Sequence, residues 1–172
     1  MRRLITLLAF AFILVLVQAV PSQAKKPLTG TMDLEFNLSW PGPQDVIPDW
    51  VGTITIDGTE YGMAFFAIGS GKAFDDVPGK VHFFEEIWTI YDWMTFDFGT
   101  QELEYGEILL WGYDVGVTCL NGHNTNYHMS GNVEVAIGDF AVWQGRNAHM
   151  SGEIIWYDFG APHYAPGTFR IN

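Results

Sequence analysis

The residues best suited to chemistry are two consecutive acids, Glu85 and Glu86. Neighbouring residues of a β-strand point to opposite faces, so one carboxyl group is directed inward whichever way a sheet is turned. A carboxyl group in an apolar interior has a raised pKa and can serve as a general acid or base. Alternation places Glu86 on one face with His82, Phe84 and Trp88. We therefore take Glu86 and His82 as the catalytic candidates; a structural acid that is hydrogen-bonded to a buried Tyr, Trp or His is the alternative.

The chain is rich in large aromatic side chains, with seven tryptophans and seven tyrosines. A Trp ring buries well only where its N–H finds a partner, so some of these rings should line a cavity or its mouth. We predict a pocket for a small apolar or aromatic molecule, with Phe84, Trp88 and Trp111 facing it. Ordinary core packing of the same rings is the alternative.

Histidine is the remaining candidate ligand, and His128 and His149 are the pair to test for metal binding because they occupy equivalent places in a repeat. Zinc needs three or four converging ligands, and the spacings typical of zinc sites do not occur in the sequence. Nor does the sequence contain a nucleophile elbow, a phosphate-binding glycine loop or a dinucleotide fingerprint. We therefore predict no cofactor.

The repeat is the segment 127–133, echoed by 148–154 with His-Met-Ser-Gly identical in both. An offset of 21 residues suits two strands of roughly ten residues joined by a turn. Each copy has one apolar face and one face carrying His, Ser and an acid. The polar rows either face solvent or line a cavity, and the copies lie either on next-but-one strands or at opposite ends of a pair.

Short runs of β-branched and aromatic residues, separated by Gly, Pro, Asn and Asp, predict an all-β chain. We predict eight strands near residues 30–39, 50–57, 60–69, 79–91, 105–118, 126–137, 147–158 and 168–171. Asp57-Gly58 between two alternating runs predicts a tight hairpin turn. The fold class is a single antiparallel, roughly eight-stranded up-and-down β-barrel, with the proline-rich stretch Pro41–Pro48 crossing or capping one end.

The N-terminus predicts export. Arg2 and Arg3 precede an apolar stretch from Leu4 to Val20, and Ser22-Gln23-Ala24 presents small residues at the positions that a signal peptidase reads. We predict cleavage after Ala24, a barrel domain over residues 25–172, and a secreted or periplasmic location without stable membrane association. A retained membrane anchor is the alternative, since the apolar stretch is about the shortest that spans a bilayer.

The mature chain is acidic. Loss of residues 1–24 removes two of eight basic residues and no acidic ones, so the formal net charge changes from -12 to -14. Such a surface disfavours nucleic acid and anionic lipid as partners. The single cysteine excludes an intrachain disulfide, so stability depends on packing and backbone pairing. Asn37-Leu38-Ser39 matches a glycosylation acceptor.

From Gly106 onward the chain resembles the allene oxide cyclase and dirigent-like, calycin-like β-barrels. The resemblance rests on Gly138-Asp139-Phe140, on Gly145-Arg146-Asn147-Ala148 and on Gly152-Glu153-Ile154. The hairpin over residues 51–68 and the run over residues 82–90 are also similar to the family's meander. The resemblance implies the barrel fold and transfers no catalytic residue to this chain.

The sequence therefore favours an exported barrel that binds a small, largely apolar ligand without catalysis. One alternative is an isomerase or cyclase in which an inward Glu86 and His82 transfer a proton. The other is an interaction module whose aromatic side chains form a contact surface. The oligomeric state cannot be predicted from the sequence.

Overall fold

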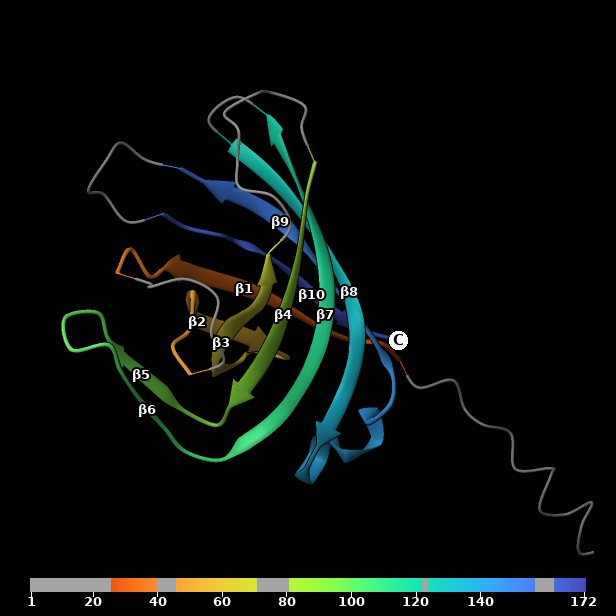
Figure 1. The fold of residues 1–172 in the computed structure, drawn as a ribbon. Coiled ribbons are helices and arrows are strands. Elements are labelled where there is room, and N and C mark those ends of the chain that lie inside the picture. The colour runs from red at the N-terminus through yellow and green to blue at the C-terminus, as the bar shows by residue number, and fades with distance from the viewer. Residues whose placement is uncertain (1–25, 40–45, 71–80, 122–123, 157–162) are drawn as a thin grey trace, which may run out of the picture.

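The computed structural model describes residues 26–39, 46–70, 81–121, 124–156 and 163–172, and the fold is a closed antiparallel barrel (Figure 1). Eight strands close it in the order β1-β10-β9-β8-β7-β4-β3-β2. Their bounds are β1 Leu28–Phe36, β2 Trp50–Ile56, β3 Thr59–Ser70, β4 Val81–Tyr91, β7 Ile108–Asn121, β8 Asn124–Ala136, β9 Asn147–Ile155 and β10 Gly167–Ile171. Barrel strands that follow one another along the chain are neighbours in the barrel, and the first strand pairs with the last. The predicted up-and-down fold class is therefore confirmed.

All eight predicted strands correspond to strands of the barrel. The turn between β2 and β3 is the predicted Asp57-Gly58 turn, with φ of 49° at Asp57 and 82° at Gly58. Two consecutive positive φ angles match the twist of the flanking strands, and Gly adopts them without steric cost. Of the proline-rich stretch, residues 40–45 lie outside the described residues, whereas Pro48 is buried.

A two-stranded arm between β4 and β7 is absent from the sequence prediction. It consists of β5 Met94–Asp97 and β6 Glu102–Tyr105, and it lies against the outside of the barrel (Figure 1). Its apolar residues Met94, Phe96 and Leu103 pack on a second small core formed by Val51, Ala64, Phe66 and Tyr91. Strands β2, β3 and β4 are therefore buried on both faces where the arm covers them.

The main core lies in the barrel interior and is mostly apolar. Its most deeply buried members include Ile54, Met63, Ile90, Leu110 and Phe169, each at most 1% exposed. The 3₁₀ helix η1, Gly138–Trp143, joins β8 to β9 and adds the buried Trp143 to this core. In the described part of the chain, no helix is long and apolar enough to cross a membrane.

The two copies of the repeat lie on neighbouring strands and pair directly. Met129 of β8 is opposite Met150 of β9, and His128 is opposite Ser151. Because the strands are antiparallel, the copies are related by a local twofold axis, an arrangement that the sequence interpretation did not include. The methionines are buried and both histidines are exposed, so the polar rows face outward.

Candidate functional site: carboxyl groups inside the barrel

Two carboxyl groups lie opposite each other on the inner face of the barrel. Glu86 of β4 pairs with Asp114 of β7, and their side chains are 6% and 1% exposed. The residues paired with them on the next strands are small: Ala67 of β3 pairs with Glu86, and Gly131 of β8 pairs with Asp114. A side chain at Gly131 would collide with the backbone of Asp114, so glycine is required beside this carboxyl group.

Asp49 adds a third carboxyl group from the residue that precedes β2. It is 4% exposed, and its backbone N–H donates to the carbonyl oxygen of Phe65 at 3.0 Å. Its carboxyl group lies beside that of Glu86 and near the backbone N–H groups of Trp50 and Ala67, whose interactions oppose the rise in its pKa. The strand register shifts between Ala67 and Gly69, and such bulges commonly adjust backbone direction beside functional sites.

Asn37 holds the segment that carries Asp49. The backbone N–H of Asn37 donates to the carbonyl oxygen of Asp49 at 2.8 Å, and Asn37 Nδ2 donates to the carbonyl oxygen of Pro48 at 3.1 Å. The same Nδ2 donates to Gln101 Oε1 of the arm at 2.6 Å. Asn37 is fully buried, so its side-chain amide is not accessible for glycosylation once the protein has folded.

Aromatic rings lie on both sides of the Glu86–Asp114 pair. Trp88 lies over Gly112, where an added Cβ would come within 2.7 Å of Trp88 Cε2. Phe84 lies in the same way over Gly116, where an added Cβ would meet Phe84 Cε1 at 2.7 Å. Because Glu86 lies between the two aromatic residues along β4, the carboxyl groups occupy a row between the two rings.

Tyr127 contributes a further ring from β8. A Cβ added to Gly152 would lie 2.6 Å from the Tyr127 hydroxyl oxygen, and one added to Gly167 would also meet that oxygen. The tyrosine side chain therefore lies over the paired glycines of β9 and β10. Burial, followed by the charge of Glu86, raises the pKa of Tyr127, so its hydroxyl remains a neutral donor or acceptor.

Where β1 and β2 approach β9 and β10, a second group of rings lies close to Asp49. Trp50 is tilted against Phe36 with ring centroids 5.0 Å apart, and Trp156 lies 6.3 Å from Trp50. His163 lies edge-on to Trp156 at 4.9 Å. Trp156 Nε1 donates to Thr125 Oγ1 at 2.7 Å, so the indole N–H within this group of rings is satisfied.

Several buried polar atoms of the interior have no hydrogen-bond partner among the residues that the structure describes. They are Asp49 Oδ1, both Oδ atoms of Asp114, Trp88 Nε1, Thr118 Oγ1 and the Tyr127 hydroxyl. Each buried polar group without a partner costs about 1–3 kcal/mol. Concentrating them on one inner surface is therefore expensive for the fold.

The environment of the three acids favours their neutral forms. Burial raises the pKa of Asp49 to about 7, although the hydrogen bonds it accepts oppose that shift. Burial and then the charge of Asp49 raise the pKa of Asp114 to about 8. Burial, assisted by the charges of Asp49 and Asp114, raises the pKa of Glu86 well above its usual range. The cluster thus contains carboxylic acids and a carboxylate at neutral pH, and it can donate, accept or exchange protons.

The sequence analysis placed three of its candidates together correctly in space. Glu86 and Trp88 are buried, Phe84 is half-buried, and all three point to the barrel interior. His82 belongs to β4 and pairs with Thr118, but its side chain lies outside the described residues.

The prediction for Trp111 is wrong. Trp111 pairs with Thr89 and Val135, and it alternates with the inward residues Leu110 and Gly112. Its half-buried ring therefore lies on the outer face of the sheet. The error arises because strand periodicity identifies which residues share a face within a strand, whereas the relation between two strands depends on register.

His128 and His149 share the outer face of neighbouring strands, and both are exposed. Ser130 Oγ lies 3.1 Å from His149 Nδ1, so a serine rather than a third metal ligand contacts this histidine. Across the described residues, no group of three or more His, Cys, Asp or Glu side chains is arranged to hold a metal ion.

Asp49, Asp114 and Tyr127 were not among the predicted site residues. A signal for Asp114 is present in the sequence, because it is the only charged residue between Glu107 and Glu134 and lies within an apolar strand. Asp49 gave no such signal, since it precedes its strand and alternation does not apply to it.

Comparison with known proteins adds no relative, since no family model, no curated protein and no solved structure matches this chain. The resemblance to allene oxide cyclase and dirigent-like barrels therefore stays a prediction.

Proposed function

We propose that this protein is an exported barrel that binds a small molecule in its interior. In this proposal the carboxyl groups of Asp49, Glu86 and Asp114 bind a polar group of the ligand. The rings of Phe84 and Trp88 contact its apolar part. The ligand is thus amphipathic rather than wholly apolar, which modifies the expectation from aromatic content.

The observation that carries this proposal is the set of buried polar atoms that have no partner among the described residues. Replacing buried charged or polar groups by apolar residues of similar volume is often neutral or stabilising. Three buried carboxyl groups beside Trp88 and Tyr127 therefore lower the stability of the fold, and a role in binding a ligand accounts for their presence. Ligand sites of this type are mostly apolar with a few convergent polar groups.

The test compares two adjacent glutamates that face opposite sides of β4. Glu86→Gln changes the interior, whereas Glu85→Gln removes one charge from the exposed outer face. Native mass spectrometry of the protein purified from its own source should show a bound small molecule, retained by Glu85→Gln and reduced at least tenfold in occupancy by Glu86→Gln. The same spectrum reports whether residues 1–24 have been removed.

Equal occupancy in the two variants would contradict binding at the carboxyl cluster. A protein that carries no small molecule and takes none up from an extract of its source would contradict the proposal as a whole.

Proton-transfer catalysis is the second candidate, favoured by the proximity of the Glu86 and Asp49 carboxyl groups. An Asp49 carboxylate with a pKa of about 7 could remove a proton from carbon next to a carbonyl group. The protonated Glu86 would stabilise the enolate oxygen by a hydrogen bond and keep its proton. In an unsaturated carbonyl compound, Asp49 would then return the proton that it removed to a different carbon of the conjugated enolate, which completes an isomerisation and restores both carboxyl groups. Incubating the complex in deuterium oxide separates the candidates, since only catalysis introduces carbon-bound deuterium into the ligand.

A further inference from the structure

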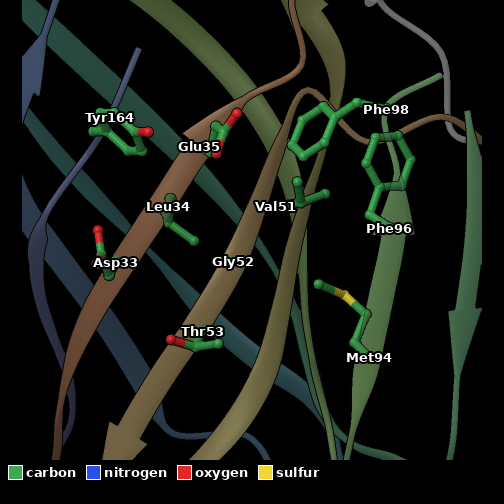
Figure 2. Close-up of a pocket in the computed structure, with 10 residues that line it drawn as sticks. All are labelled: Asp33, Leu34, Glu35, Val51, Gly52, Thr53, Met94, Phe96, Phe98 and Tyr164. Carbon is green, nitrogen blue, oxygen red and sulfur yellow. The ribbon is translucent and has the colours of Figure 1, made fainter. Parts of the chain in front are cut away.

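A hollow lies on the outside of the barrel, between β1 and the arm (Figure 2). Its floor is the outer surface of β2 at Val51, Gly52 and Thr53, and its volume is about 290 Å³. We call it the outer groove. It is separate from the interior carboxyl cluster, because Asp33 and Glu35 alternate with the inward residues Met32 and Leu34.

The two walls of the outer groove differ in chemistry. Asp33 and Glu35 of β1 form one wall, and Figure 2 shows them on the side opposite Phe96 and Phe98. Phe96 and Phe98 meet edge to face with ring centroids 5.0 Å apart and planes at 89°. Met94 extends this apolar wall along β5 (Figure 2).

Close packing of the arm on the barrel sets the position of the aromatic wall. A Cβ at Gly62 of β3 would collide with Cβ of Met94, so the absence of a side chain at Gly62 allows β5 to approach the sheet. Asn37 Nδ2 anchors the arm again through Gln101 Oε1 at 2.6 Å. The aromatic wall is thus held at two places beside the acidic wall.

None of the described residues that line the outer groove is basic. We propose that the outer groove is a binding site for a small organic ammonium ion with an apolar or aromatic arm. The ammonium group would lie beside Asp33 and Glu35, and the arm would lie against Met94, Phe96 and Phe98. This site is independent of the interior function.

Each feature of the groove selects for this chemistry. Two carboxylates on one strand attract a cation and repel an anion. Aromatic faces add attraction for an ammonium group and for an apolar arm. A volume of about 290 Å³ is at the small end of ligand pockets, which favours a molecule of modest size over a folded partner.

The experiment titrates the full barrel domain with 2-phenylethylammonium and follows backbone amide resonances. We expect shifts concentrated at residues 33–35, 51–53 and 94–98, together with at least tenfold weaker binding of the neutral analogue 2-phenylethanol. The variant Asp33→Asn/Glu35→Gln should weaken amine binding about fivefold to tenfold, as expected for two exposed ion pairs.

Glu60→Gln/Glu104→Gln is the matched control because it removes two charges from exposed residues that do not line the groove. It should bind the amine within about twofold of the unmodified protein. Equal weakening by both double variants, or equal binding of the amine and the alcohol, would overturn the proposal. Tenfold tighter binding of blocked Lys-Phe than of the amine would overturn the small-molecule assignment in favour of a peptide.

Amine shifts confined to interior residues would also refute the outer groove, although they would leave the interior function intact. Conversely, loss of interior ligand in Glu86→Gln has no bearing on amine binding at Asp33 and Glu35. The two proposals can therefore fail separately.

Discussion

Asp49, Glu86 and Asp114 show how position changes the chemistry of an ordinary side chain. Acidic residues are abundant in this chain, and most of those described are exposed and form ordinary surface. These three lie among aromatic and apolar side chains, where water is excluded and mutual repulsion adds to the cost of ionisation. A buried carboxylic acid is both a donor and an acceptor, which suits binding or proton transfer.

The raised pKa values predict an unusual dependence of stability on pH. The pKa values of Asp49 and Asp114 rise from 3.8 to about 7 and about 8, so the folded state binds protons that the unfolded state releases. Stability should therefore fall as the pH rises from about 4 to about 8, with a pKa difference of one unit worth about 1.4 kcal/mol. Denaturant unfolding at pH 5.5 and 8.5 should show a loss on the order of a few kcal/mol.

Asp49→Asn/Asp114→Asn is the control for this effect, because it removes both titrations and should make the profile shallower, with only the raised pKa of Glu86 still lowering stability as the pH rises. The lowered pKa of His163 acts in the opposite direction, since its burial favours the neutral ring. A free energy of unfolding that rises between pH 5.5 and 8.5 in the unmodified protein would contradict the assignment of buried, neutral acids.

The β5–β6 arm is the element that most changes the outside of the barrel. Strands β4 and β7 already pair directly from Val81↔Cys119 to Tyr91↔Ile108, so the arm is an insertion between barrel strands. It gains stability by covering Val51, Phe66 and Tyr91, and it creates one wall of the outer groove.

Gly62→Val should displace this arm while leaving the barrel closed. The added side chain would collide with Met94, and the barrel strands do not depend on the arm for pairing. We expect faster hydrogen exchange over residues 94–105 and weaker binding of amines to the outer groove. Exchange in β8 and β9 should change little, and unchanged exchange throughout the arm would show that Gly62 does not control its docking.

At the scale of the whole molecule, closure between β1 and β10 removes the free edges of the eight-stranded sheet. Five residue pairs join these strands, from Leu28↔Ile171 to Met32↔Gly167. A closed sheet has no exposed row of unpaired backbone groups, which limits association through strand edges. Closure also defines the interior that holds both the apolar core and the carboxyl groups.

A substitution at Phe169 of β10 tests how much the last strand contributes to the stability of the closed barrel. Its ring is 1% exposed and meets Trp88 edge to face at 5.4 Å, whereas Thr168 on the same strand is exposed. Phe169→Ala should lower the free energy of unfolding by about 3–5 kcal/mol through loss of buried area and formation of a cavity. Thr168→Ala should cost less than about 1 kcal/mol. Comparable losses in thermal or denaturant unfolding would contradict a core role for β10.

The sequence alone predicted the eight barrel strands and which residues share a face within β4, β8 and β9, because alternation and turn residues act within one strand or hairpin. Glu86, Phe84 and Trp88 were grouped correctly because all three belong to β4. The same local patterns of Met94 and Phe96 in β5, and of Leu103 and Tyr105 in β6, were present but missed, because each strand has only four residues.

Only the tertiary structure decided which residues meet across strands. Asp114 faces Glu86 because β7 pairs with β4 in one register, and a shift of one residue would place Asp114 outside. Asp49 joins them because the residue before β2 is hydrogen-bonded to Phe65 of β3, two residues from Ala67, which pairs with Glu86. Register and closure arise from contacts between segments far apart in the chain, whereas sequence periodicity describes only neighbours along it.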